Sequence, residues 1–260
     1  MKTGLSLSGG GARGIAHLGV LKALDELNVN IHALSGTSSG AIAGALYSFG
    51  LSPDNILDII ISTRYFRLIR PAISLTGLLK MEAVEPTFRK YLGDTSFRDL
   101  SIPLTVCVTN LRSGKPEYIA EGDVTRALMA SSALPVVFDP VTIQGDLYVD
   151  GGILNNMPVE PLVGRCNKII AVHTNPAGDD FNATHIKAVL ERVFLLSVAA
   201  SAYTRTGYCD LMLEPPLMKN FGVFDLPKAE EIFNIGYEYT MKCKKEILSL
   251  LDTEDKFIGE

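Results

Sequence analysis

The chain has 260 residues, of which 47% are hydrophobic, and a net charge of -5. With a mean hydropathy of +0.21 it can bury a large core, and we predict a single domain over residues 1–260. The acidic charge gives no attraction to a phosphate polymer, which argues against nucleic acid as a partner. The four cysteines are far apart and lack metal-ligand spacing, so we predict no metal and no other cofactor.

The first predicted elements alternate between strand and helix. A short apolar run from Leu5 to Leu7 predicts a strand that ends in three glycines. Apolar residues at helical spacing from Gly14 to Leu27 predict a helix, and a second strand is expected near Ile31 to Ser35. An alanine-rich helix is then predicted from Ala41 to Phe49, ending at a glycine.

The rest of the chain continues this alternation. Strands are predicted at residues 103–109, 141–143, 147–149 and 168–173. Helices are predicted at residues 54–63, 82–91, 184–205 and 228–251. Short apolar strands that alternate with helices predict a mostly parallel sheet with helices on both faces.

Gly36-Thr37-Ser38-Ser39-Gly40 is a GxSxG pentapeptide between a predicted strand and a predicted helix. Flanking glycines permit a sharp turn that presents the middle serine, and the helix N-terminus favours a developing negative charge. The alternative is a small-residue turn in which Ser38 or Ser39 caps the helix. The strand-helix context favours Ser38 as a nucleophile over Ser39.

The segment from Gly9 to Gly14, which reads GGGARG, also lies between a strand and a helix. It matches a dinucleotide-binding pattern, but no acidic residue follows at the distance that a ribose hydroxyl requires. Consecutive glycines can instead form an oxyanion hole, for which the candidates are Gly9, Gly10, Gly11, Arg13 and Gly14. The charge of Arg13 suits a substrate phosphate or carboxylate, and an ordinary surface cation is an equal alternative.

Asp150-Gly151-Gly152 follows a predicted strand. Two glycines after an acid allow close backbone approach, which can bring a carboxylate against another loop. By itself this sequence is also a common turn signal. Its significance therefore depends on the other two motifs.

In this order, GGGARG, GTSSG and DGG make the chain resemble the patatin-like phospholipase family over roughly residues 5–158. The resemblance implies a three-layer α/β/α sandwich with a central, mainly parallel sheet. It also implies a dyad of Ser38 as nucleophile and Asp150 as base, an oxyanion hole around Gly10 and Gly11, and release of fatty acids from lipids without a metal. The C-terminal helical part, about residues 184–251, lies outside this resemblance.

Alternatives remain for the base and for the function. His173 closes a predicted strand and would complete a Ser-Asp-His triad, whereas His17 falls within the first helix and is expected to be packed there. The predicted function is lipid acyl hydrolysis. The alternatives are acyl transfer to another acceptor and non-catalytic lipid binding or storage.

Residues 64–80 combine basic and apolar side chains and lack an acidic residue. Such a segment is typical of a lid or a surface that contacts anionic lipid, and a core-packing connection is the alternative. No stretch reaches the roughly 18 apolar residues of a spanning helix, and the N-terminal apolar run is short for a signal peptide. We therefore expect a cytoplasmic protein with peripheral membrane contact.

Overall fold

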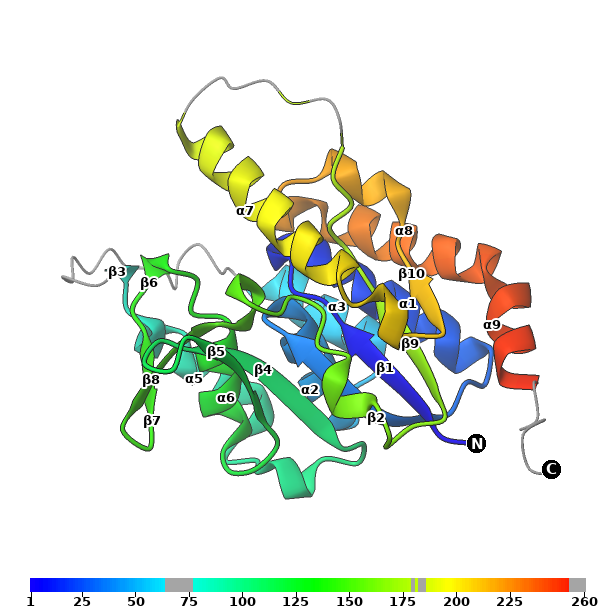
Figure 1. Cartoon of the computed structure of the whole chain (residues 1–260), viewed down its shortest axis with the longest axis horizontal. Coiled ribbons are helices and arrows are strands. Elements are labelled where there is room, and N and C mark those ends of the chain that lie inside the picture. The colour runs from blue at the N-terminus through cyan, green and yellow to red at the C-terminus, as the bar shows by residue number, and fades with distance from the viewer. Residues whose placement is uncertain (64–76, 179–180, 182–185, 253–260) are drawn as a thin grey trace.

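The computed structural model describes residues 1–63, 77–178, 181 and 186–252. Within them, an 8-stranded sheet has the order β10-β9-β1-β2-β4-β8-β7, with β5 paired to β4 (Figure 1). Its strands are β1 (Thr3–Leu7), β2 (Ile31–Thr37), β4 (Leu104–Asn110), β5 (Lys115–Ile119), β7 (Val141–Ile143), β8 (Asp146–Asp150), β9 (Lys168–Val172) and β10 (Leu211–Leu213). A separate pair is formed by β3 (Gly77–Leu79) and β6 (Val136–Phe138).

The five strands from β10 to β4 are parallel, and the antiparallel strands β5, β8 and β7 lie beyond them. Every residue of β1 and of β4 is buried, as expected for parallel strands that are covered on both faces. The predicted mainly parallel sheet is confirmed. The parallel strands end at the same edge, where Ser8, Ser38 and His173 follow β1, β2 and β9.

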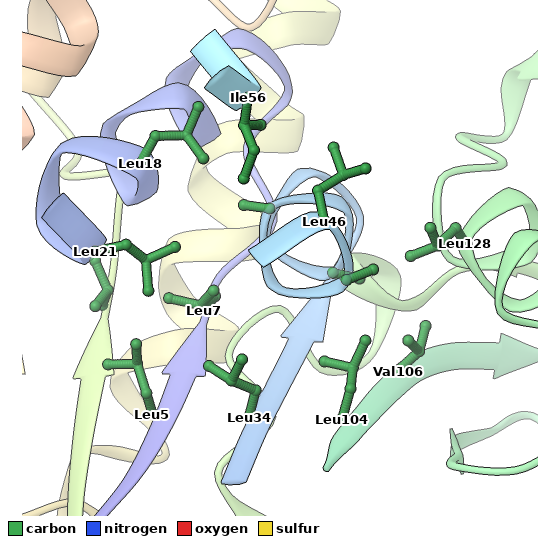
Figure 2. Close-up of a cluster of buried hydrophobic side chains, with 14 of the residues drawn as sticks. Leu5, Leu7, Leu18, Leu21, Leu34, Leu46, Ile56, Leu104, Val106 and Leu128 are labelled. Carbon is green, nitrogen blue, oxygen red and sulfur yellow. The ribbon is translucent and has the colours of Figure 1, made fainter. Parts of the chain in front are cut away.

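Helices cover both faces of the sheet. They are α1 (Ala16–Glu26), α2 (Ser39–Ser48), α3 (Pro53–Ser62), α5 (Glu85–Leu92), α6 (Val124–Ser131), α7 (Ile186–Tyr203), α8 (Ala229–Lys242) and α9 (Lys244–Asp252). The larger core joins the sheet to α1, α2, α3, α6 and α8, and Figure 2 shows Leu5, Leu7, Leu34 and Leu104 of the strands within it. A smaller core packs α7 and residues 157–162 against the sheet. The predicted three-layer sandwich is confirmed.

The structure also differs from the predicted elements. The predicted helix over residues 228–251 is two helices, α8 and α9, which meet at Cys243. The first predicted helix begins with a short 3-10 turn, Gly11–Ile15, before α1. Strands β3, β5, β6 and β10 and helix α6 were not predicted. β5 is a half-exposed edge strand containing a proline, and β3, β6 and β10 have only three residues each.

Two expectations concern membranes. Among the helices of the described residues, none has the length and the apolar character needed to cross a bilayer. Of the basic and apolar segment at 64–80, residues 64–76 lie outside the described residues. The lid hypothesis for that segment therefore stays a prediction.

Candidate active site

Ser38 lies at the junction of β2 and α2, with φ 50 and ψ -122. A positive φ is uncommon for a residue other than glycine and marks a strained turn. The adjacent glycines allow it: a Cβ at Gly36 would lie 2.7 Å from the Ala41 backbone, and one at Gly40 would lie 2.4 Å from the Leu7 carbonyl oxygen. The strained turn and the two close approaches together give the geometry that the GxSxG motif predicts.

The backbone of Ser38 is held by hydrogen bonds through a buried serine, Ser131. The Ser38 amide donates to Ser131 Oγ at 2.8 Å, and Ser131 Oγ donates to the Cys107 carbonyl oxygen at 2.6 Å. Ser131 lies in α6, a helix that the sequence pattern did not predict. The sequence pattern therefore did not identify Ser131 as a residue that supports Ser38.

Asp150 ends β8, and its carboxylate contacts Ser38. Its Oδ1 accepts from the Gly152 amide at 2.7 Å, and the Ser38 side chain is close enough to lower the pKa of the carboxyl group. Only 3% of Asp150 is exposed. Burial raises its pKa to about 6, although the hydrogen bond from the Gly152 amide and the nearby Ser38 side chain oppose this shift. At neutral pH the carboxyl is mostly ionised, yet it is more basic than an exposed aspartate.

The glycine segment passes directly beside Ser38. A Cβ at Gly9 would lie 3.2 Å from Ser38 Cβ, and a Cβ at Gly14 would lie 2.2 Å from Ser39 Oγ. The Gly9 amide donates to the Asn156 carbonyl oxygen at 3.1 Å, so this amide is already used. Within the described part of the chain, the amides of Gly10 and Gly11 form no hydrogen bond. These two N–H groups are therefore free to donate to a bound group beside Ser38.

Arg13 fits neither of the two roles expected for it, a charge beside the substrate and an ordinary surface cation. Only 4% of this residue is exposed, so the surface-cation alternative is wrong. Its Nε donates to the Phe221 carbonyl oxygen at 2.6 Å. Burial lowers its pKa to about 10, opposed by the charges of Glu191 and Asp225. Arg13 is also absent from the described residues that line the cavity at Ser38, because its guanidinium is directed to the segment 221–225.

His173 pairs with a carboxylate other than Asp150. Its Nδ1 lies 2.7 Å from Glu214 Oε1, and its ring contacts Tyr203 edge-on at 5.3 Å between centroids. It is fully buried and lies outside the described lining of the cavity. His17 is also buried, as expected, with Nε2 2.7 Å from the Ser8 carbonyl oxygen. The contacts of His173 therefore give no support to the triad alternative.

A cavity of about 280 Å³ brings these groups together. Ser38, Asp150 and the three glycines from Gly9 to Gly11 line it, and most of its remaining walls are apolar. Phe194 of α7 and residues 223, 224 and 226 contribute walls that no sequence motif indicated. Across the described residues, no group of three or more His, Cys, Asp or Glu side chains is arranged to bind a metal ion. The site can thus hold an acyl chain beside a serine, a carboxylate and free amides.

The comparisons with known proteins give relatives and a shared fold. An uncharacterized NTE family protein of Mycobacterium bovis is 34% identical over 177 residues, which cover 67% of this chain and 49% of the relative. The lysophospholipase nte1 of Aspergillus terreus is 30% identical over 292 residues, covering 96% of this chain and 18% of the relative. The chain thus spans less than two thirds of the length of these curated relatives.

The fold is similar to two solved structures. VipD from Legionella pneumophila aligns with a TM-score of 0.64 at 17% identity, covering 94% of this chain and 67% of that chain. Human GIVD cytosolic phospholipase A2, solved with a fluorophosphonate inhibitor, aligns at 0.57 and 11% identity, covering 97% of this chain and 59% of that chain. The model of the family described as patatin-like phospholipase matches residues 5–163. The chain therefore belongs to the patatin-like phospholipase family.

Proposed function

We propose that the chain hydrolyses carboxylic ester bonds of lipids, with Ser38 as nucleophile and Asp150 as its base. One observation carries this proposal: Ser38 and a buried carboxyl group of raised pKa, that of Asp150, line the same largely apolar cavity, and the Ser38 side chain is close enough to lower that pKa. A buried carboxylate is a stronger base than an exposed one, so it can accept a serine proton without a histidine.

In the first half-reaction, Ser38 Oγ attacks the ester carbonyl carbon while its proton passes to Asp150. The amides of Gly10 and Gly11 donate to the resulting oxyanion. When this intermediate collapses, the bond to the alcohol breaks and Asp150 returns its proton to the leaving oxygen. The alcohol departs, and the acyl group remains on Ser38.

In the second half-reaction, water attacks the acyl carbonyl while Asp150 again accepts a proton. Collapse releases the fatty acid, and the proton returns to Ser38 Oγ. The names of the relatives and structural neighbours, a lysophospholipase and a phospholipase A2, support a lipid ester as substrate. The largely apolar cavity supports it too, because it is chemically matched to an acyl chain.

Labelling with a fluorophosphonate probe, together with hydrolysis of an acyl ester, tests the proposal. Ser38→Ala should lose labelling and reduce hydrolysis by about 10³-fold or more. Its fold should remain, since only a hydroxyl is removed. Ser39→Ala is the matched comparison and should keep the label. Persistent labelling of Ser38→Ala would contradict the assignment, and an unlabelled wild type would favour lipid binding or storage.

Acyl transfer is the second candidate, because an acceptor alcohol can replace water in the second half-reaction with the same residues. Analysis of products in the presence of an added alcohol separates the two reactions. Contact with a lipid surface stays a prediction, which sedimentation with anionic and neutral liposomes tests. Equal sedimentation with both would argue against an electrostatic contribution from residues 64–80.

A further inference from the structure

The glycine segment, which follows β1, contacts a residue that follows the neighbouring strand β9 at the same edge of the sheet. Strand β9 pairs with β1 in parallel register, with Leu7 opposite Val172. The pairing continues past both strands, because the Ser8 amide donates to the Val172 carbonyl oxygen at 3.0 Å and the Thr174 amide donates to Ser8 Oγ at 3.1 Å. This register places Asn175 beside Gly9.

Asn175 is fully buried, with an exposed fraction of 0%, and its side-chain amide contacts the glycine segment. Its Nδ2 donates to the Gly9 carbonyl oxygen at 2.6 Å. Asn156 adds a longer hydrogen bond of 3.4 Å to the same oxygen. Within the described residues, Asn175 Oδ1 has no hydrogen-bond partner. The contact with Gly9 is therefore the hydrogen bond that gives this buried side chain its orientation.

The Gly9 carbonyl and the Gly10 amide belong to one peptide group. A trans peptide is planar, so its C=O and N–H point in opposite directions. A donor that fixes the carbonyl on one side therefore fixes the direction of the N–H on the other side. Asn175 lies outside the described lining of the cavity, whereas Gly10 lines it and its amide has no partner within the described chain. The free N–H is consequently directed away from Asn175.

Gly10 also makes room for this contact. A Cβ at Gly10 would lie 2.7 Å from Asn175 Oδ1 and 2.9 Å from Thr174 Oγ1. A side chain at position 10 would therefore displace Asn175 from the Gly9 carbonyl. Close packing and the hydrogen bond act on the same peptide group.

We propose that Asn175 is a positioning residue, which holds the Gly9–Gly10 peptide so that the Gly10 amide faces the oxyanion formed on Ser38. The proposal rests on the proposed function, because it assumes that the ester carbonyl is attacked at this site. Asn175 acts through the peptide and does not touch the substrate. Its loss should weaken binding of the tetrahedral intermediate and leave binding of the uncleaved ester nearly unchanged.

Two variants and two ligands test this inference. Asn175→Ala removes the donor and some volume, and Asn175→Leu removes the donor but keeps the branched shape at a larger volume. The control is Asn155→Ala, because Asn155 is also fully buried but donates to Tyr118 and Glu160. Each variant is first compared by thermal unfolding, and then by kcat and KM for a p-nitrophenyl acyl ester.

We expect both Asn175 variants to lose about 10- to 100-fold in kcat with KM within about threefold, since removal of a complete oxyanion donor costs about 100-fold or more. A trifluoromethyl ketone, which adds to the serine as a tetrahedral adduct, should bind weaker by a similar factor. An uncleavable ether analogue should bind as before. Asn155→Ala should keep the wild-type ratio of the two affinities even if its melting temperature falls.

The proposal is overturned if folded Asn175→Leu keeps the kcat and the ketone affinity of the wild type within about threefold. It is also overturned if both ligands weaken equally, because that result indicates a general loss of structure. Measuring Ser38→Ala in parallel distinguishes a failure of the proposed function from a failure of the role proposed for Asn175. If Ser38→Ala retains hydrolysis, the proposed function fails, whereas an effect of Ser38→Ala without one of Asn175→Leu rejects only the role of Asn175.

Discussion

The part of the chain matched by the family model, residues 5–163, and the part that follows it contribute differently to the cavity. The first part contains the hydroxyl, the carboxyl and the glycine amides. The second contributes Phe194 and the apolar residues at 223–226, together with the Asn175 contact to Gly9. The proposed catalytic groups thus come from short motifs with local geometry, whereas the cavity walls and supports around them come from long-range contacts.

The largest effect should follow from changing the carboxyl group of the motif-bearing part. Asp150→Asn keeps the shape and an oxygen for the Gly152 amide, but it removes the proposed base. We expect a loss of about 10³-fold or more in kcat/KM for an acyl ester. Stopped assays of purified, folded protein measure it. Retention of more than a tenth of the activity would exclude Asp150 as the base.

The pH dependence of kcat/KM and of stability gives a second test of Asp150. Since the pKa of Asp150 is raised to about 6, wild-type kcat/KM should fall as the pH falls through about 6 and level off above it. In the folded state the Asp150 carboxyl stays protonated up to about pH 6, whereas in the unfolded chain it loses its proton near its ordinary pKa of 3.8. The free energy of unfolding therefore falls as the pH rises from 3.8 to about 6. Asp150→Asn should therefore be the more stable protein at pH 8, by at most about 3 kcal/mol. The difference should disappear near pH 4.

A smaller effect on catalysis is expected from Arg13, which joins the part at residues 5–163 to the part that follows it. The Arg13 guanidinium donates to Phe221, and the Ala12 amide donates to the Val223 carbonyl oxygen at 2.8 Å, so the first turn holds a cavity wall. Arg13→Gln should raise KM by about 3- to 30-fold for long acyl esters, and less for short ones, with kcat nearly unchanged. Comparing KM across chain lengths measures it, with the exposed Arg112→Gln as control. A loss confined to kcat would instead favour a direct role in the oxyanion hole.

The smallest effect on activity is expected at His173, in the second part. His173→Gln should keep activity within about threefold, because the ring contacts Glu214 and Tyr203 and lies outside the described lining of the cavity. It should lower stability by about 1 to 3 kcal/mol, since a buried hydrogen bond to a carboxylate is lost. Activity and thermal unfolding are measured on the same sample. Near-total loss of activity in a folded variant would restore the triad alternative.

The sequence predicted the parallel sheet and the three motifs, because glycine and apolar periodicity act locally. Ser38 could be recognised since its neighbours at 36 and 40 must be glycine for the turn to form.

Arg13 could not be placed from the sequence, because its hydrogen-bond partner is a carbonyl more than two hundred residues away. Asn175 follows a predicted strand, but only the register of β9 against β1 brings it to Gly9. The end of α8 at Cys243 is likewise without a local signal, as neither glycine nor proline lies near it.

The position of β1 in the middle of the sheet has a consequence for the timing of assembly. Strand β1 is made before the other strands of the sheet but pairs with β9, and the segment from Gly9 to Ala12 is held by groups at residues 156, 175 and 223. A nascent chain that has reached Asp150 therefore already carries both proposed catalytic side chains, while the contacts that hold the glycine segment are still unmade. The proposed hydrolytic activity is therefore expected only after the segment at 223 has left the ribosome.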